Sequence, residues 1–119
     1  MPVKQLEANL RHEPDLAIIE LHGEIDGFAE EALDKAYLEA ESKQPKTILL
    51  NFKDVNYINS TGIALIVSLL AKARKEHRRL AISNLSDHYK EIFQITRLAD
   101  FMTIFPDEPT AREALMNLD

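Results

Sequence analysis

The residues best suited to chemistry lie in Asp54-Val-Asn-Tyr-Ile-Asn-Ser-Thr-Gly62, a polar segment between two apolar runs. Asn59, Ser60 and Thr61 are residue types that satisfy free N–H groups at the start of a helix. Asn59 or Ser60 can therefore be a plain N-cap. The hydroxyl groups of Ser60 and Thr61 would also stand at the positive end of the helix dipole, where an attached anion is tolerated. The segment therefore suits either a structural cap or a phosphorylation switch.

Three carboxylates, Glu24, Asp26 and Asp54, occur in segments that a fold can bring near Ser60. Asp26 can be an ordinary solvated acid in a turn before a helix. Alternatively, the three can cluster near Ser60, where they would repel a phosphate and sharpen the change of charge. Their spacing does not match that of a metal site. We therefore expect no metal and no cofactor.

Signatures of catalysis by this chain are missing. The four histidines are scattered, and the sequence contains no HExxH, P-loop or GxGxxG motif. A serine hydrolase would carry its nucleophile in G-x-S-x-G, whereas Ser60 lies in Ile58-Asn59-Ser60-Thr61-Gly62. We therefore expect no catalytic residue and a protein that is not an enzyme.

Composition excludes several classes of protein. The 119 residues carry 14 Lys and Arg against 20 Asp and Glu, a net charge of −6. This sign disfavours direct nucleic-acid binding and attraction to an anionic membrane surface. With no Cys, a disulfide framework and a thiolate metal site are excluded. The start MPVKQLEANLRHEPD lacks the apolar region of a signal peptide, and the longest apolar run is too short to span a bilayer. A cytoplasmic protein is expected.

The hydrophobic pattern predicts an opening hairpin and then alternating helices and strands. The predicted strands are residues 3–11, 16–22, 47–52, 79–83 and 102–105. The predicted helices begin at Gly27, at about Ser60, after Ser86 and at the capping-box residue Thr110, with Leu118 on the apolar stripe of the last one. Lys53 to Ile58 is predicted to be a polar connection. This order indicates one α/β domain over residues 1–119, with a mixed, mostly parallel sheet covered by about four helices.

The second helix, predicted over residues 60–77, adjoins the Ser60 segment. Its buried stripe is predicted to be Ile63, Ile66, Val67, Leu70 and Ala73. Leu65 and Leu69 lie off that stripe. They are candidate partner-binding residues because they add apolar surface next to Ser60, although leucines at such positions are more often part of the core.

Two short motifs carry a resemblance to a known family. Gly23-Glu24-Ile25-Asp26 and Asn59-Ser60-Thr61-Gly62 resemble elements of the STAS domains of bacterial anti-sigma factor antagonists. Those proteins show Gly-Glu-(Leu/Ile)-Asp and Asp-Ser-(Ser/Thr)-Gly at this spacing. The order of elements and the length agree over nearly the whole chain.

The resemblance implies a binding module that sequesters an anti-sigma factor when it is unphosphorylated. It implies a serine protein kinase, often the anti-sigma factor itself, that phosphorylates the residue matching Ser60. A metal-dependent serine phosphatase would remove that phosphate. Asp26 matches the acidic residue near the switch. The other residues placed next to the switch are Asn59, Thr61 and Gly62, and the partner-binding candidates are Glu24, Asp54, Leu65 and Leu69.

This sequence departs from the family pattern at Asn59, where Asp is usual. Asn keeps the capping oxygen and loses a negative charge, so kinase recognition can differ. One alternative therefore stays open: a STAS subunit of a lipid-transport or stress-signalling complex without a kinase cycle. A separate alternative, of a different class, is a small serine hydrolase that uses Ser60.

Overall fold

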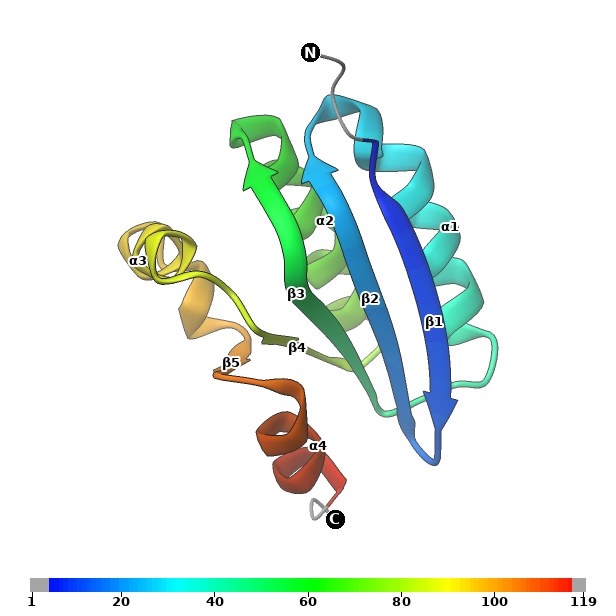
Figure 1. Cartoon of the computed structure of the whole chain (residues 1–119). Coiled ribbons are helices and arrows are strands. Elements are labelled where there is room, and N and C mark those ends of the chain that lie inside the picture. The colour runs from blue at the N-terminus through cyan, green and yellow to red at the C-terminus, as the bar shows by residue number, and fades with distance from the viewer. Residues whose placement is uncertain (1–4, 117–119) are drawn as a thin grey trace.

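A single mixed sheet organises the computed structural model, which describes residues 5–116 (Figure 1). Its strands are β1 (Glu7–Glu13), β2 (Leu16–Ile25), β3 (Thr47–Ile58), β4 (Arg79–Ser83) and β5 (Thr103–Phe105). They lie in the order β1-β2-β3-β4-β5. β1 is antiparallel to β2, and the remaining neighbours are parallel. The predicted hairpin followed by a parallel sheet is confirmed.

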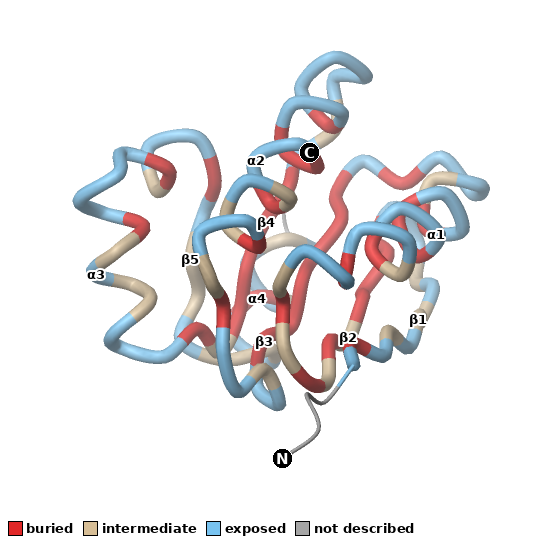
Figure 2. The backbone as a smooth tube through the Cα atoms, turned by 90° about the horizontal axis from the view of Figure 1, so that it is seen from above, coloured by how far each residue is buried: buried red, intermediate tan, exposed pale blue. Residues whose placement is uncertain are grey.

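Helices cover the two faces of this sheet unequally. The helical elements are η1 (Gly27–Ala29), α1 (Glu30–Glu41), α2 (Ser60–Lys75), α3 (Asp87–Ile95), η2 (Leu98–Asp100) and α4 (Glu108–Met116). The larger core fills the space between the sheet, α1, α2 and α3, whereas α4 alone covers a small apolar cluster on the opposite face (Figures 1 and 2). Within residues 5–116, no helix is long and apolar enough to cross a membrane.

The parallel pair β2–β3 is longer than predicted. β2 continues past His22 to Ile25, and the expected polar connection Lys53–Ile58 is the second half of β3. Twelve residues of β3 run beside ten of β2, with register shifts between Glu20 and His22 and between Gly23 and Glu24. These bulges interrupt the alternation of polar and apolar residues in β3, which is the pattern that identifies a strand in a sequence. Gly23 takes the positive φ of 115° that the irregular backbone requires.

The buried stripe of α2 is rotated relative to the prediction. Ile66, Leu69, Leu70 and Ala73 are buried at helical spacing, and Leu69 is only 1% exposed. Val67, predicted to be buried, is 44% exposed. The predicted role of Leu69 in direct partner contact is therefore wrong, because its side chain belongs to the core.

The beginning of α4 also differs from the prediction. Its cap is Asp107 rather than Thr110, because a carboxylate oxygen of Asp107 accepts the Thr110 N–H at 2.8 Å. This hydrogen bond holds the pKa of Asp107 below its usual value. Leu118 lies outside the described residues, as do the first two residues of the predicted strand 3–11.

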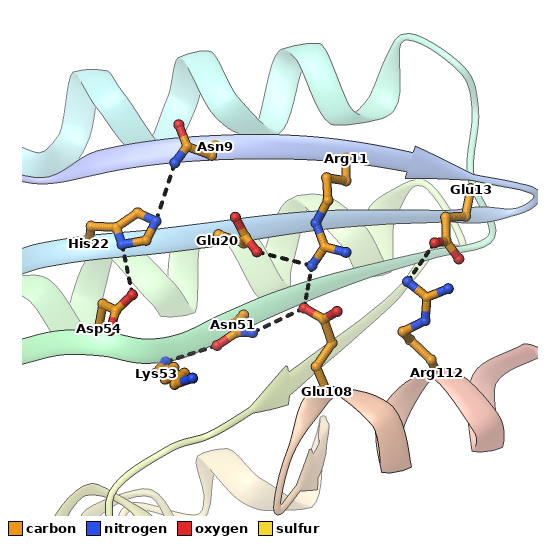
Figure 3. A network of polar contacts seen from close by, with 10 residues as sticks. All are labelled: Asn9, Arg11, Glu13, Glu20, His22, Asn51, Lys53, Asp54, Glu108 and Arg112. Carbon is orange, nitrogen blue, oxygen red and sulfur yellow. Dashed lines mark hydrogen bonds and ion pairs between the residues drawn. The ribbon is translucent and has the colours of Figure 1, made fainter.

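Polar contacts hold α4 against the sheet (Figure 3). Glu108 pairs with Arg11 of β1 and accepts a hydrogen bond from the Asn51 side-chain amide of β3 at 3.0 Å. One turn later, Arg112 pairs with Glu13. Ala111 is fully buried between these contacts. The first strand and the last helix are thereby joined across nearly the whole length of the chain.

Glu108→Gln is expected to destabilise the protein in a pH-dependent way. The Arg11 contact lowers the pKa of Glu108, so the ionised carboxylate stabilises the folded state. That contribution is fully present above the unfolded pKa of about 4.3. It is lost as the pH falls through the lower folded pKa. Chemical denaturation should give a loss of about 1 to 2 kcal/mol at pH 7 and a smaller loss at about pH 3. Glu91→Gln, an exposed change on α3, should have little effect. Equal losses by Glu108→Gln at both pH values would contradict this role.

Candidate functional site

The two sequence motifs meet at one edge of the sheet. Ile25 and Ile58 are register partners and the last residues of β2 and β3. Asp26 and Asn59 follow them and begin η1 and α2 respectively. The carboxyl edge of parallel strands is where α/β folds commonly place their functional groups. Topology therefore brings together segments that lie more than thirty positions apart in the sequence.

Asn59 is the N-cap of α2, which confirms one of the two predicted alternatives, Asn59 and Ser60. Its side-chain oxygen accepts the Gly62 N–H at 2.8 Å, and its backbone is extended. Its own N–H donates to the carbonyl of Ile25 at 3.2 Å. The capping residue thus also fastens the start of α2 to the end of β2.

Gly62 allows α2 to approach β2 closely. A Cβ atom at this position would lie 1.9 Å from the Ile25 carbonyl oxygen and 2.7 Å from its carbon. Both are backbone atoms and cannot rotate away. Any residue other than glycine would therefore displace the start of α2, so glycine is needed for packing rather than for partner contact.

Ser60 and Thr61 form the exposed first turn of α2. Asn59 takes up the Gly62 N–H, and the structure shows no acceptor among residues 5–116 for the N–H groups of Ser60 and Thr61. Free amides and the helix dipole favour an anion at this position. Ser60 is exposed, so a group attached to its side chain would lie outside the core.

Asp26 organises the neighbouring turn. Its carboxylate accepts the Phe28 N–H at 2.9 Å, so it is the cap of η1. A Cβ built on Gly27 would lie 3.6 Å from the Thr61 side chain, which places η1 directly against the start of α2. Phe28 is left 87% exposed. A ring this exposed in η1, the turn that packs against the start of α2, is an unusual surface feature that its sequence context did not indicate.

The three carboxylates do not gather around Ser60. Asp54 pairs with His22 at 3.0 Å, three register positions before the end of β2, or about 10 Å along the strand. Glu24 lies opposite Tyr57, nearer the end. Asp54, Glu24 and Asp26 therefore lie one after another toward the carboxyl ends of β2 and β3, and they do not form one cluster. Among the described residues, no group of three potential ligands could hold a metal ion.

His22 is engaged away from Ser60. Its Nδ1 faces Asp54, and its Nε2 lies 3.3 Å from the side-chain nitrogen of Asn9 (Figure 3). An Asn N–H donated to Nε2 implies that the Nδ1 proton faces Asp54. Within residues 5–116, no histidine is hydrogen-bonded to Ser60. This arrangement lacks the nucleophile–base contact of a serine hydrolase.

Tyr89 is a residue of the site that the sequence did not reveal. Its hydroxyl oxygen accepts the Ile58 N–H at 2.9 Å. β4 ends opposite Asn51, so the second half of β3 lacks a neighbouring strand on that side within residues 5–116. Tyr89 supplies the missing acceptor one residue before Asn59 and so ties α3 to this loop.

An uncharged surface extends from Ser60 along α2. Residues 60–71 contain no charged side chain. Those that face solvent, here called the α2 surface, are Ser60, Thr61, Ala64, Val67, Ser68 and Ala71. Leu65 is half-buried beside them. Solvent-facing helix sides are normally rich in charge, so this face is typical of a contact surface.

Gly62→Ala should destabilise the protein by at least about 2 kcal/mol, because the added methyl group collides with the Ile25 carbonyl. Gly27→Ala is the matched control. Its Cβ would make an ordinary contact at 3.6 Å, so the change should be neutral or slightly stabilising. Chemical denaturation of both variants measures this difference. Similar midpoints for the two would refute the close-approach explanation.

Asn59→Ala should cost about 1 kcal/mol of stability, because the Gly62 N–H loses its side-chain acceptor. Asn59→Asp keeps an oxygen at the same place and should be close to neutral. The denaturation midpoints of the two variants decide the matter. An unchanged midpoint in Asn59→Ala would mean that the cap contributes nothing.

A family model and a related sequence both point to the same protein family. The STAS domain family model matches residues 7–111. The chain is 28% identical to an anti-sigma-B factor antagonist of Staphylococcus aureus over 86 residues, which cover 72% of this chain and 80% of that protein.

Two solved structures share the fold. An anti-sigma factor antagonist from Mycobacterium paratuberculosis has a TM-score of 0.81 at 17% identity, covering 95% of this chain and 96% of that one. The Bacillus cell fate determinant SpoIIAA in its phosphorylated form has a TM-score of 0.71 at 23% identity, covering 91% and 98%. At these identities the likeness concerns the fold alone, whereas the family model spans most of the sequence. The chain belongs to the STAS domain family.

Proposed function

We propose that this protein is an anti-sigma factor antagonist, a binding module controlled by phosphorylation of Ser60. In its unphosphorylated form it sequesters an anti-sigma factor that is also a serine kinase, and a metal-dependent serine phosphatase reverses the modification. The observation that carries the proposal is the exposed Ser60 hydroxyl at the start of α2, beside two free backbone N–H groups and at the head of the uncharged α2 surface. The names of the relatives support the class of partner.

A phosphate on Ser60 should leave the fold intact. It adds about −1.5 to −2 charges at neutral pH, at the end of α2 where the dipole and the free amides favour an anion. Asn59 is neutral and adds no repulsion. Asp26 is the nearest acid along the neighbouring turn, and its carboxylate is already directed to the Phe28 N–H. The switch therefore acts on binding rather than on folding.

Binding should respond strongly to the same phosphate. The α2 surface and the exposed Phe28 ring offer a partner an uncharged contact area. Leu65 lies at its margin, and Glu24 and Tyr57 lie at the adjoining end of the sheet. An interface that covers Ser60 would have to bury a phosphate with no cation prepared for it among residues 60–71. Burying the phosphate charge without a cation would greatly weaken the binding of the anti-sigma factor.

A cognate anti-sigma kinase with ATP should add one phosphate, measured by intact mass. Ser60→Ala should abolish the addition, and Thr61→Ala should retain it. The phosphoprotein should bind the anti-sigma factor at least about a hundredfold more weakly than the unmodified protein, while its thermal midpoint shifts by only a few degrees.

Three outcomes would contradict this proposal. One is phosphate persisting in Ser60→Ala and lost in Thr61→Ala. The others are undiminished binding by the phosphoprotein and a large drop in its midpoint. Stable association with a lipid-transport or stress-signalling complex, without any phosphate transfer, would instead favour the alternative role that the neutral Asn59 leaves open.

A further inference from the structure

The outer edge of β1 is unpaired within the described part of the chain. β1 lies at the end of the strand order and pairs with β2 along all seven of its residues. The opposite end of the sheet is β5, which has only three residues. A seven-residue edge presents a row of backbone N–H and C=O groups that can extend the sheet into another chain. Figure 2 shows β1 at the margin of the molecule beside α1.

A surface groove of about 450 Å³ runs along this edge, between β1 and α1. Its floor is apolar and consists of Ala8, Leu10, Ala32 and Ala36. Lys35 and Glu39 of α1 also line it, as do Glu7 and Asn9 of β1, whose side chains turn to the opposite face of the sheet. The α1 side of the groove carries both signs of charge, and three of its four floor residues are alanines, so a neighbouring strand and helix can pack closely.

We propose that β1 pairs with β1 of a second copy of this chain, antiparallel and about a twofold axis at Asn9. The pairing would join two five-stranded sheets edge to edge and place the two α1 helices side by side over the groove. A twofold interface uses the same patch on both copies, so the patch must be complementary to itself.

The charges of β1 select this register. An axis at Asn9 places Glu7 opposite Arg11 of the second copy, twice by symmetry, and Ala8 opposite Leu10. An axis at Leu10 would instead place Glu7 opposite Glu13, also twice. Opposite charges directly across an antiparallel pair are stabilising, and like charges are destabilising.

Arg11 can meet Glu7 of the second copy without releasing α4. Both of its ion pairs, with Glu20 and Glu108, use Nη2. Its side chain is 40% exposed, and no acceptor among residues 5–116 contacts its Nη1. Alternation along the strand puts Glu7, Asn9 and Arg11 on one face, with Ala8 and Leu10 on the face toward α1. Charged and apolar pairs thus form on separate faces of the extended sheet.

The pairing leaves the Ser60 end of the molecule free. Ser60 begins α2 after β3, whereas the contact uses β1 and the side of α1 next to it. A dimer built in this way would carry two α2 surfaces, and it requires no assumption about phosphorylation.

Single cysteines test the register, because the natural sequence contains none. The axis places residue 9 opposite itself, with Cα atoms about 4.5 to 5.5 Å apart, within disulfide reach. Asn9→Cys should therefore give a covalent dimer on mild oxidation. His12→Cys on the same strand would lie about 20 Å from its symmetry mate and should not. Glu91→Cys on α3 measures random collision. Circular dichroism checks that each variant is folded.

Sedimentation of the natural sequence should show a concentration-dependent dimer. Glu7→Arg places like charges opposite Arg11 and should weaken it by about tenfold or more. Glu91→Arg makes the same change of charge on α3 and should not. Two results would overturn the proposal. One is a natural protein that stays monomeric to roughly 1 mM together with Asn9→Cys crosslinking no faster than Glu91→Cys. The other is crosslinking through His12→Cys in preference to Asn9→Cys, which would mean a different register or a different contact.

Discussion

The close contact between Gly62 and the Ile25 carbonyl constrains most of this structure. With no side chain at position 62, the first turn of α2 can rest on the last residue of β2. Asn59 strengthens the same junction, since its N–H donates to Ile25 and its side chain accepts from Gly62. Ser60 and Thr61 lie between these two anchors. Their exposure results from the backbone that holds them and does not require a dedicated pocket.

The extended β2–β3 pair supports this junction from the other side. The two bulged positions in β3 let twelve residues reach the same endpoint as ten residues of β2. Without these bulges, Ile25 and Ile58 would not be register partners, and the segments that contain Asp26 and Asn59 would not lie side by side. Tyr89 then holds the exposed margin of β3 through the Ile58 N–H. The bulges in β3 and the Tyr89 hydroxyl of α3 therefore help to set the position of α2, although neither lies in that helix.

Regular patterns made the architecture predictable. The hairpin, the parallel strands and the helices followed from apolar periodicity and from Gly and Pro. The capping role of Asn59 was one of two alternatives that followed from residue type. The second half of β3 was missed because bulges remove the alternation that marks a strand. Val67 was wrongly assigned to the core and Leu69 to a possible contact surface, because residues 60–71 of α2 carry no charged side chain that would indicate which side faces solvent.

Other features depend on contacts between distant segments and leave no local trace. Asp107 took the place of Thr110 as the cap of α4 because both residues are good caps and the packing of Ala111 selects the starting turn. The hydrogen bond from Ile58 to Tyr89 and the pairing of Asp54 with His22 join residues about thirty positions apart. Nothing in either segment alone indicates its partner.

The separation between the packing residues and the solvent-facing residues of α2 has an evolutionary consequence. The side chains that fasten this helix face inward or belong to its cap, whereas Ala64, Val67, Ser68 and Ala71 face solvent. Substitutions at these four outward positions leave the Gly62 junction unchanged. After gene duplication, paralogues could diverge at the outward positions while keeping Ser60, the proposed phosphorylation site. Under the proposed function, a cell could then run several such regulators in parallel without crosstalk, because the proposed contact positions differ from the positions that hold the fold.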